Sequence, residues 1–458
     1  MNPSSRPRRV AVIGGGVTGL TVAYRLVHQD AALEVTVYEG DARPGGKLCS
    51  VQVGSLTLPA GADSFLARKP WGVALCKELG VELEAPGTTG AHLWTETGLV
   101  PLPKDAPFGI PGDIGEVLRW PGVSSKGRRR AAQDLLRKKR KDGVEESLGG
   151  LLRRRLGDEA TDRAVAPLLA GLYAGDVDRL SARATFPDLE RWESWQGSLI
   201  RGAQAATRHS KRGDPGPMFV RPRGGVDRLI EAIAERLGPR VRTGSERATL
   251  EGLDADAVVV ATSAGEAAGL LEGSAPVAAA DLAGIPYAST GVVLMVYGED
   301  TQRGLPKGTG FVVPRGEAPM TAATWLSSKW PDESFGTRAV VRSFVGAVGE
   351  QDILNADDDE LVDACARHLT ALVSLPDRPE HAAVVRWPAS MPQYDVGHQG
   401  RVARIRASLP AGIFVVGQAY DGVGIPDCVR AAGETAAQVL AYLDDDAKPT
   451  PNDEETVR

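Results

Sequence analysis

The strongest constraint on the fold is a glycine motif near the start of the chain, Gly14-Gly-Gly-Val-Thr-Gly19. It follows a short β-branched run ending at Ile13 and precedes helically spaced apolar residues from Leu20 to Val27. In such a GxGxxG motif, the first glycine permits a tight turn, the second lets the backbone approach a pyrophosphate, and the third lets the helix pack on the strand. The free N–H groups at the start of the helix also favour phosphates. The motif therefore predicts a dinucleotide site.

A second apolar run, 35–38, comes directly after this helix, so the first forty residues predict a βαβ unit and a parallel sheet. Glu39 ends that run, 20 residues beyond Gly19, where a carboxylate can accept hydrogen bonds from ribose hydroxyls. The pair Gly45-Gly46, followed by Lys47, favours FAD over NAD. Such a doublet resembles the flavoproteins of the amine oxidase and phytoene desaturase superfamily, whose extra loop closes over the FAD pyrophosphate. The alternative is an ordinary Pro-Gly surface turn.

Length and composition exclude several other classes of protein. A chain of 458 residues predicts about three domains at roughly 150 residues each, and its net charge of −6 gives no basis for binding nucleic acid. The 4 cysteines and 6 histidines are scattered, so neither a disulfide framework nor a metal site is predicted. No secretory signal and no uncharged apolar run of about 18 residues occurs, and we expect a cytoplasmic protein. We therefore expect a bound cofactor, and not the side chains of the protein, to carry the chemistry.

The rest of the pattern separates helices from strands. From Asp113 to about Ser210 the spacing is helical and charged, which predicts a helical subdomain. A long helix is expected over about 429–444, followed by a disordered tail. Strands are expected at 257–262, 291–297, 310–314, 339–345 and 413–417.

A set of longer strings narrows the family. In chain order they are GADSFLARKP, PLLAGLYAGDVDRLSARATFP, PRGGVDRLIEAIAERL, GTGFVVPR, TWLSSKWP, RWPASMPQYDVGHQGR and GQAYDGVGIPDC. In these strings the chain resembles the bacterial protoporphyrinogen/coproporphyrinogen oxidases of haem synthesis, from about Arg8 to Tyr442. The strings most specific to this family are YAGD, with the LS that follows it, and MPQYxVGH. GVGIPDC looks more like the coproporphyrinogen-oxidising enzymes of Gram-positive-type bacteria than like the protoporphyrinogen-specific branch.

The resemblance implies an α/β fold of the amine oxidase/phytoene desaturase-like superfamily, with a Rossmann-type FAD-binding domain, a mixed α+β substrate domain and a helical subdomain. The implied boundaries are 6–70, 215–265 and 385–445 for the FAD-binding domain, 71–104 and 266–384 for the substrate domain, 105–214 for the helical domain facing membrane or partner, and 446–458 for the tail.

The resemblance also implies contacts to a non-covalently bound FAD, while no catalytic side chain and no metal ligand is assigned. These contacts are Gly14, Gly15, Gly16, Val17, Thr18 and Gly19 for the pyrophosphate, Glu39 for the ribose, Lys47, Gly61, Ala62, Asp63 and Ser64 near the phosphates and ring, and Trp387, Val423, Gly424, Ile425 and Pro426 at the isoalloxazine. The helix that follows GVGIP can direct its N–H groups to the flavin edge where reduction builds negative charge. Cys428 allows a covalent flavin link, although a structural cysteine is the favoured interpretation.

One departure from the family pattern leaves the adenine contact open. The family usually carries a longer hairpin between the strands that flank Glu251-Gly-Leu253, and here that tripeptide is nearly all that joins them. The backbone contact to adenine then falls near Arg247 or Ala248.

The implied reaction is the oxygen-dependent oxidation of coproporphyrinogen III to coproporphyrin III, with hydrogen peroxide as the second product; the alternative substrate is protoporphyrinogen IX. A flat macrocycle needs an apolar pocket with cations at its rim for the propionates. The candidates are Arg68 and Lys69 for carboxylates, and Leu172 and Tyr173 for the rings. The alternative for Arg68 and Lys69 is a solvated cation on the surface, and the alternative for Leu172 and Tyr173 is a position in the core.

A basic segment, 126–141, concentrates nine bases and includes the acid Asp134. It can bind anionic lipid headgroups or an acidic partner such as ferrochelatase, or it can be the exposed face of a helix. Two rival functions remain for the whole chain: a flavin amine oxidase, and a non-catalytic FAD-fold scaffold or haem-delivery protein.

Overall fold

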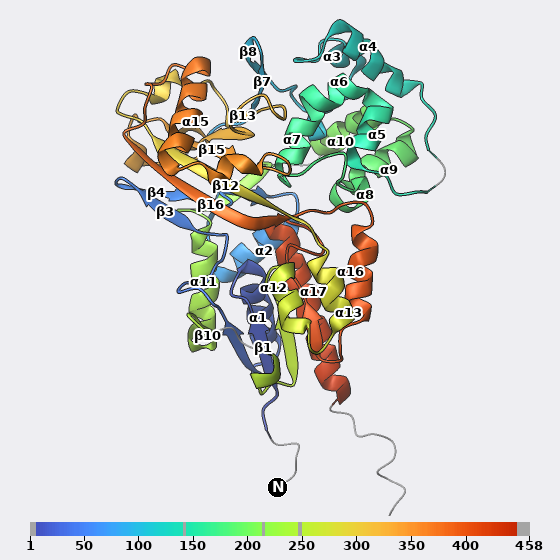
Figure 1. Cartoon of the computed structure of the whole chain (residues 1–458), viewed down its shortest axis with the longest axis vertical. Coiled ribbons are helices and arrows are strands. Elements are labelled where there is room, and N and C mark those ends of the chain that lie inside the picture. Colours follow the sequence, from blue (N-terminus) through green and yellow to red (C-terminus); the bar gives the residue numbers. More distant parts are fainter. Residues whose placement is uncertain (1–5, 141–142, 213–215, 246–249, 447–458) are drawn as a thin grey trace, which may run out of the picture.

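The computed structural model describes residues 6–140, 143–212, 216–245 and 250–446. A parallel sheet wrapped by helices forms one half of the molecule, and a larger mixed sheet and a cluster of helices form the other half (Figure 1). No helix within the described ranges has both the length and the apolar content to cross a membrane.

The parallel sheet confirms the predicted Rossmann-type part. Its strand order is β10-β2-β1-β11-β17, and every neighbouring pair is parallel. The strands are β1 (Arg9–Ile13), β2 (Glu34–Tyr38), β10 (Val241–Arg242), β11 (Ala257–Val260) and β17 (Ile413–Val415).

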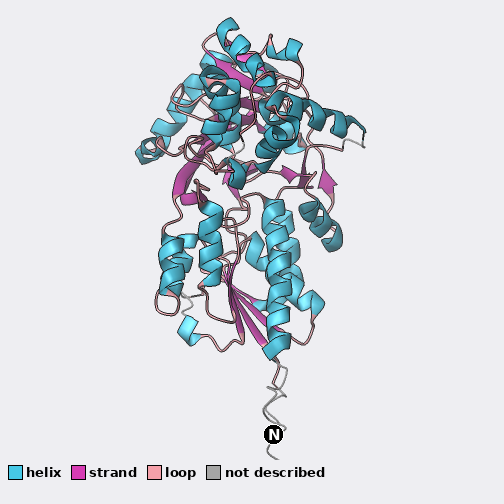
Figure 2. Ribbon diagram, turned by 90° about the vertical axis from the view of Figure 1, so that its right-hand side faces the viewer, coloured by secondary structure: helices cyan, strands magenta, loops and turns pink. Residues whose placement is uncertain are grey.

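Alternating side chains of these strands are buried on opposite faces of the sheet. Val10 and Val12 pack with one group of helices, α1 (Val17–Gln29), α2 (Pro70–Leu79), α11 (Asp227–Leu237) and α17 (Ile425–Asp446). Ala11 and Ile13 pack with the other group, α12 (Ala264–Leu271), α13 (Pro276–Ala283) and α16 (His398–Ala407). Because both faces are covered, the strands are almost wholly apolar, and Figure 2 shows them enclosed between helices.

A seven-stranded sheet of order β16-β12-β15-β14-β13-β7-β8 forms the centre of the second half. Its strands are β7 (His92–Thr95), β8 (Gly98–Pro101), β12 (Tyr287–Val296), β13 (Gly310–Val312), β14 (Ala322–Trp325), β15 (Val340–Val345) and β16 (His381–Pro392). Helix α15 (Asp358–Leu372) packs on one face, and the hairpin of β3 (Ser50–Val53) and β4 (Leu56–Pro59) packs on the other. A three-stranded sheet comprises β5 (Phe65–Leu66), β9 (Phe219–Pro222) and β6 (Leu83–Glu84).

The predicted helical stretch contains helices and no strand among its described residues. Its α-helices are α3 (Ile114–Val117), α4 (Ser125–Ala132), α5 (Leu148–Leu156), α6 (Asp158–Ala160), α7 (Ala166–Gly171), α8 (Ala182–Thr185), α9 (Pro187–Gln196) and α10 (Leu199–Arg212). Asp134 and Arg155 form a fully buried ion pair of 2.5 Å in its core. The hydroxyl of Ser198 and the N–H of Ile200 also donate to Asp134, so its carboxylate is satisfied despite burial.

The predicted domain boundaries stay predictions, and two elements lie across them. The boundary at 384/385 falls inside β16, which pairs with β12 on both sides of it. Helix α2, placed with the substrate domain by its residue numbers, packs in the core shared by α1 and α17.

The closing helix α17 begins at Ile425, four residues before the predicted start at Val429. Pro426 is tolerated there because the first turn of a helix does not use the missing proline N–H. Asp446, the first residue of the predicted tail, is the last residue of α17. Residues 447–458, and the candidate adenine contacts Arg247 and Ala248, lie outside the described residues.

Candidate active site

The glycine turn between β1 and α1 is held so tightly that side chains are excluded at its two ends. Gly14 has φ of +107°, and its N–H donates to the Tyr38 carbonyl at 2.8 Å. A Cβ atom on Gly19 would lie 2.0 Å from the Gly14 carbonyl oxygen. The first glycine therefore supplies a left-handed backbone conformation, and the third permits the helix to approach the turn.

Gly16, the middle glycine, differs from the other two because it faces open space. It is the N-cap of α1 with φ of −69°, and no side chain caps the helix. A Cβ added to Gly16 would meet no atom of the described residues within 4 Å. Uncapped N–H groups beside a side-chain-free position fit the close approach of a pyrophosphate.

Glu39 and the second glycine pair both contact this turn. The Glu39 carboxylate accepts hydrogen bonds from the N–H groups of Gly15 at 2.7 Å and Asp41 at 2.8 Å. The N–H of Gly45 donates to the Gly15 carbonyl at 2.8 Å, and Gly45 forms a β-bridge with Gly16. The structure therefore brings these three sequence signals together at one edge of the parallel sheet.

Lys47 is half-buried and, together with Gly61 and Trp387, forms a wall next to the glycine turn. Its ammonium donates to the Ser390 carbonyl, and burial lowers the pKa of Lys47 to about 8. Gly61 lies directly against this residue, since a Cβ there would be 1.8 Å from the Lys47 carbonyl oxygen. Trp387 on β16 closes the same wall by donating its indole N–H to the Ala60 carbonyl at 3.0 Å.

Asp63 is engaged by protein groups on every side. Its carboxylate pairs with Lys329 at 2.9 Å and Arg342 at 3.3 Å, and it accepts the indole N–H of Trp330 at 2.9 Å. Burial opposes ionisation, but the two cations outweigh it and hold the pKa of Asp63 well below its usual range. Asp63 thus anchors the loop 61–64 to the seven-stranded sheet.

The neighbours of Asp63 in that loop are placed differently. Ser64 donates its hydroxyl to Asp63 at 3.0 Å, whereas Ala62 is exposed. Lys329 and Arg342, the partners of Asp63, were not among the predicted site residues. TWLSSKWP contains Lys329, but no local pattern relates either residue to Asp63.

The N-terminus of α17 meets the N-terminus of α1. Val423 and Gly424 lead into α17, whose first two residues are Ile425 and Pro426, and α17 packs along α1. The buried Cys428 thiol hydrogen-bonds with the Thr18 side chain, while burial raises the pKa of Cys428 to about 11. A thiol that stays protonated is a poor nucleophile, which favours the structural interpretation of Cys428.

The four candidate substrate residues occupy contrasting positions. Lys69 precedes α2 and pairs with Asp427, in the first turn of α17, at 2.6 Å. Asp427 was not among the predicted site residues. Arg68 is exposed, with its guanidinium 5.9 Å from the centre of the Phe108 ring. Leu172 is 55% exposed, whereas Tyr173 is 6% exposed and belongs to the core of the helical part. Tyr173 thus occupies the core position that was its alternative interpretation.

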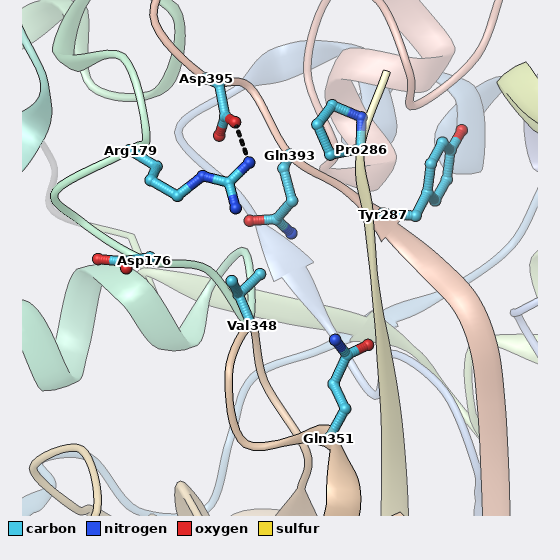
Figure 3. Close-up of a pocket in the computed structure, with 8 residues that line it drawn as sticks. All are labelled: Asp176, Arg179, Pro286, Tyr287, Val348, Gln351, Gln393 and Asp395. Atoms are coloured by element: carbon cyan, nitrogen blue, oxygen red, sulfur yellow. Dashed lines mark hydrogen bonds and ion pairs between the residues drawn. The ribbon is translucent and has the colours of Figure 1, made fainter. Parts of the chain in front are cut away.

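A polar cavity of about 110 Å³ lies where the two most specific sequence strings meet (Figure 3). Arg179 and Asp395 form an ion pair of 2.7 Å across its edge. Asp176 and Arg179 belong to the YAGD string, and Gln393 and Asp395 belong to the MPQY string. The lining residues are Asp176, Arg179, Pro286, Tyr287, Val348, Gln351, Gln393 and Asp395, so no predicted site residue lines this cavity.

The basic segment is partly used for internal bonds. Arg130 donates to three carbonyl oxygens in the last turn of α5, and Arg128 donates to the Trp120 carbonyl. The other six described bases of the segment are exposed, as is the apolar Leu136 beside them. They are Lys126, Arg129, Arg137, Lys138, Lys139 and Arg140; Lys139 donates to the Ser194 carbonyl at 2.8 Å, and Arg140 pairs with Glu146 at 3.3 Å. Lys141 lies outside the described residues.

Comparison with known proteins agrees with this geometry. Residues 17–440 match the family model described as flavin containing amine oxidoreductase. A coproporphyrinogen III oxidase of Bacillus subtilis is 32% identical, over 96% of this chain and 99% of that protein. Protoporphyrinogen oxidase 1 of Arabidopsis thaliana chloroplasts is 29% identical, over 94% and 88%. A crystal structure from Exiguobacterium sp. 255-15, named as a candidate protoporphyrinogen oxidase, superposes with a TM-score of 0.84 at 30% identity, over 95% and 99%.

Substitution of Gly16 by valine should abolish flavin binding without unfolding the protein. The new side chain meets no atom of the described residues but fills the space where a pyrophosphate would approach. We expect purified Gly16→Val to lack flavin absorbance and to keep the melting temperature of wild-type apoprotein. Gly269→Val is the matched control, because Gly269 also has no described atom within 4 Å of an added Cβ and lies on α12, which packs on the opposite face of the sheet from α1. Retained flavin in Gly16→Val would contradict the pyrophosphate assignment.

Flavin affinity should fall as the pH rises above about 8. The Lys47 ammonium is charged below its pKa of about 8 and loses its attraction for an anion above it. A charge-assisted hydrogen bond contributes about 1.5–3 kcal/mol, so the affinity should drop at least tenfold by pH 9.5, measured by titrating apoprotein with FAD. Lys47→Arg should remove the pH dependence because arginine stays charged. An unchanged pH profile in Lys47→Arg would show that another group titrates.

Proposed function

The chain belongs to the flavin-containing amine oxidoreductases, and within them to the coproporphyrinogen III oxidases, and we propose that it oxidises coproporphyrinogen III to coproporphyrin III in haem synthesis. The observation that carries the proposal is the full-length similarity to the Bacillus subtilis enzyme. The open space at Gly16 supports the use of a flavin. Lys69, a cation next to the start of α17, supports a substrate that carries carboxylates.

Protoporphyrinogen IX is the second candidate substrate. It is favoured by the similarity to the Arabidopsis thaliana enzyme and to the Exiguobacterium structure. Coproporphyrinogen carries four propionates and protoporphyrinogen two. The exposed Arg68, together with Lys69, favours the more acidic substrate, since each carboxylate needs a cationic or hydrogen-bonding partner.

We propose that the cofactor is FAD, bound without a covalent link. The glycine turn would hold its pyrophosphate, Glu39 its ribose, and the start of α17 the edge of its ring. Bound FAD would supply a hydride acceptor for the meso carbon, the proton would leave from a pyrrole N–H of the substrate, and dioxygen would serve as the oxidant that ends as hydrogen peroxide. Repeated cycles complete the macrocycle oxidation, and the protein's residues serve to orient the substrate and exclude competing reactions.

The substrate would lie between the start of α17 and the helical part. Leu172 offers an exposed apolar side chain at the end of α7. Lys69 and Arg68, which belong to the FLARKP loop, would bind the propionates of the substrate. Tyr173 would act through its packing behind Leu172, because its own ring is buried. In this arrangement, the parallel-sheet part binds the cofactor and the other two parts enclose the substrate.

We propose that the exposed bases of the segment 126–141 contact a partner, with ferrochelatase, the enzyme that receives the product, preferred over membrane lipid. Lys126, Arg129, Arg137 and Lys138 provide the charge, and Leu136 is the exposed apolar residue among them. Scattered exposed bases suit an acidic protein surface, which could also cover Leu136 and the exposed Trp195 next to Ser194, the partner of Lys139.

The test of the substrate is the growth of porphyrin fluorescence under air with reduced coproporphyrinogen III or protoporphyrinogen IX. We expect a higher kcat/KM with coproporphyrinogen III and a parallel release of hydrogen peroxide. If both substrates stay dark while flavin is bound, the proposed function fails. Turnover of amines instead would favour an amine oxidase, and bound flavin that no substrate bleaches would favour a scaffold.

Lys69→Gln should raise KM for coproporphyrinogen III about tenfold with little change in kcat. The substrate carboxylate loses a cationic partner, at about 1.5–3 kcal/mol for a charge-assisted hydrogen bond, and it meets Asp427 without the cation that now pairs with it. Lys77→Gln is the matched control, since Lys77 is exposed at the far end of the adjoining helix α2. The flavin absorbance of both variants should match the wild type. An equal rise in KM for Lys77→Gln would mean that only the overall charge matters.

A further inference from the structure

Tyr394 lies at the meeting point of three segments that are far apart in the sequence. It follows β16 and is only 1% exposed. Its ring stacks on His398 with a centroid distance of 3.9 Å and an interplanar angle of 11°, and it lies 5.6 Å from the Tyr173 ring. Its carbonyl accepts the N–H of Ser181 at 2.7 Å. Stacking on His398 of α16, and the contacts with Tyr173 and Ser181 of the helical part, therefore fix its position.

The Tyr394 hydroxyl bridges both ends of the loop that leads into α17. It donates to the Gln418 carbonyl at 2.6 Å and accepts the N–H of Gly422 at 2.8 Å. Gly422 has φ of +132°, and a Cβ there would lie 2.6 Å from the Asp427 Cβ. The loop is therefore closely fitted to the first turn of α17, and one hydroxyl satisfies a donor and an acceptor within it.

The same loop is connected to the wall formed by Lys47. The side-chain amide of Gln418 donates to the Ser390 carbonyl at 2.7 Å, and this carbonyl also accepts the Lys47 ammonium. A displacement of the loop would therefore affect the start of α17 and the Lys47 contact together.

We propose that Tyr394 is a positioning residue whose hydroxyl sets the N-terminus of α17 at the flavin edge. The hydroxyl holds residues 418–422, and these hold the first turn whose N–H groups and dipole favour negative charge. The inference rests on the flavin binding in the proposed function, and it is independent of which porphyrinogen is oxidised.

The experiment compares Tyr394→Phe with wild type, using FAD titration of apoprotein and the reduction potential of the bound flavin. Phenylalanine keeps the ring stack and leaves the Gly422 N–H and the Gln418 carbonyl without this partner. We expect FAD to bind about tenfold more weakly, which corresponds to the loss of one satisfied buried polar pair. The potential should become more negative, because a displaced helix N-terminus stabilises the reduced, negatively charged flavin less.

Tyr420→Phe is the matched control. Tyr420 is buried in the same loop, and its hydroxyl has no hydrogen-bond partner among the residues that the structure describes. It should keep wild-type affinity and potential. The proposal is overturned if Tyr394→Phe behaves as wild type, or if Tyr420→Phe shows the same losses. No porphyrinogen is present, so failure here differs from failure of the proposed function.

If Tyr394→Phe does not fold, amide hydrogen exchange of the wild-type apoprotein tests the proposal instead. The Gly422 N–H should exchange at least tenfold more slowly than an amide without a partner, because it is bonded to the Tyr394 hydroxyl. Exchange at the unprotected rate would overturn the proposal.

Discussion

The site depends on the close approach of α1 to the turn that follows β1. Where Gly19 stands, any side chain would collide with the Gly14 carbonyl, so the helix can reach this position only with glycine. That approach brings the start of α1, Glu39 and the Gly45 loop to the carboxyl edge of one parallel sheet, which is where open α/β sheets bind ligands. Helices bury the apolar side chains on both faces of β1, and this packing stabilises the edge of the sheet.

The sequence predicts most reliably where the physics is local. The glycine spacing and Glu39 predicted both the Rossmann-type part and the place of the glycine turn between β1 and α1, because turn geometry and helix start involve neighbouring residues. The ion cluster around Asp63 escaped prediction, since Lys329 lies 266 positions away in the chain. Asp427 escaped for the same reason, being 358 positions from Lys69. The exposure of Leu172 and the burial of Tyr173 also required the fold, because apolar spacing alone cannot separate a pocket wall from a core.

The strings most typical of the family turn out to touch one another. The YAGD segment reaches Tyr394 through Ser181, and Tyr394 reaches the GQAYDG loop through its hydroxyl. The YAGD and MPQY segments also line one cavity. Each segment is constrained by two others, so a change in one would have to be accommodated by both. This explains how short strings dispersed over the chain can be as specific as a long continuous motif.

The ion pair between Lys69 and Asp427 has a consequence for how an anionic molecule would bind. A carboxylate arriving at Lys69 would not meet a free positive charge; it would have to exchange with a carboxylate already in place. Binding strength then reflects the difference between two similar interactions, while Asp427, once displaced, would be left beside the positive end of α17. Such an exchange favours ligands held by several contacts at once and discriminates against small free anions, which offer only one.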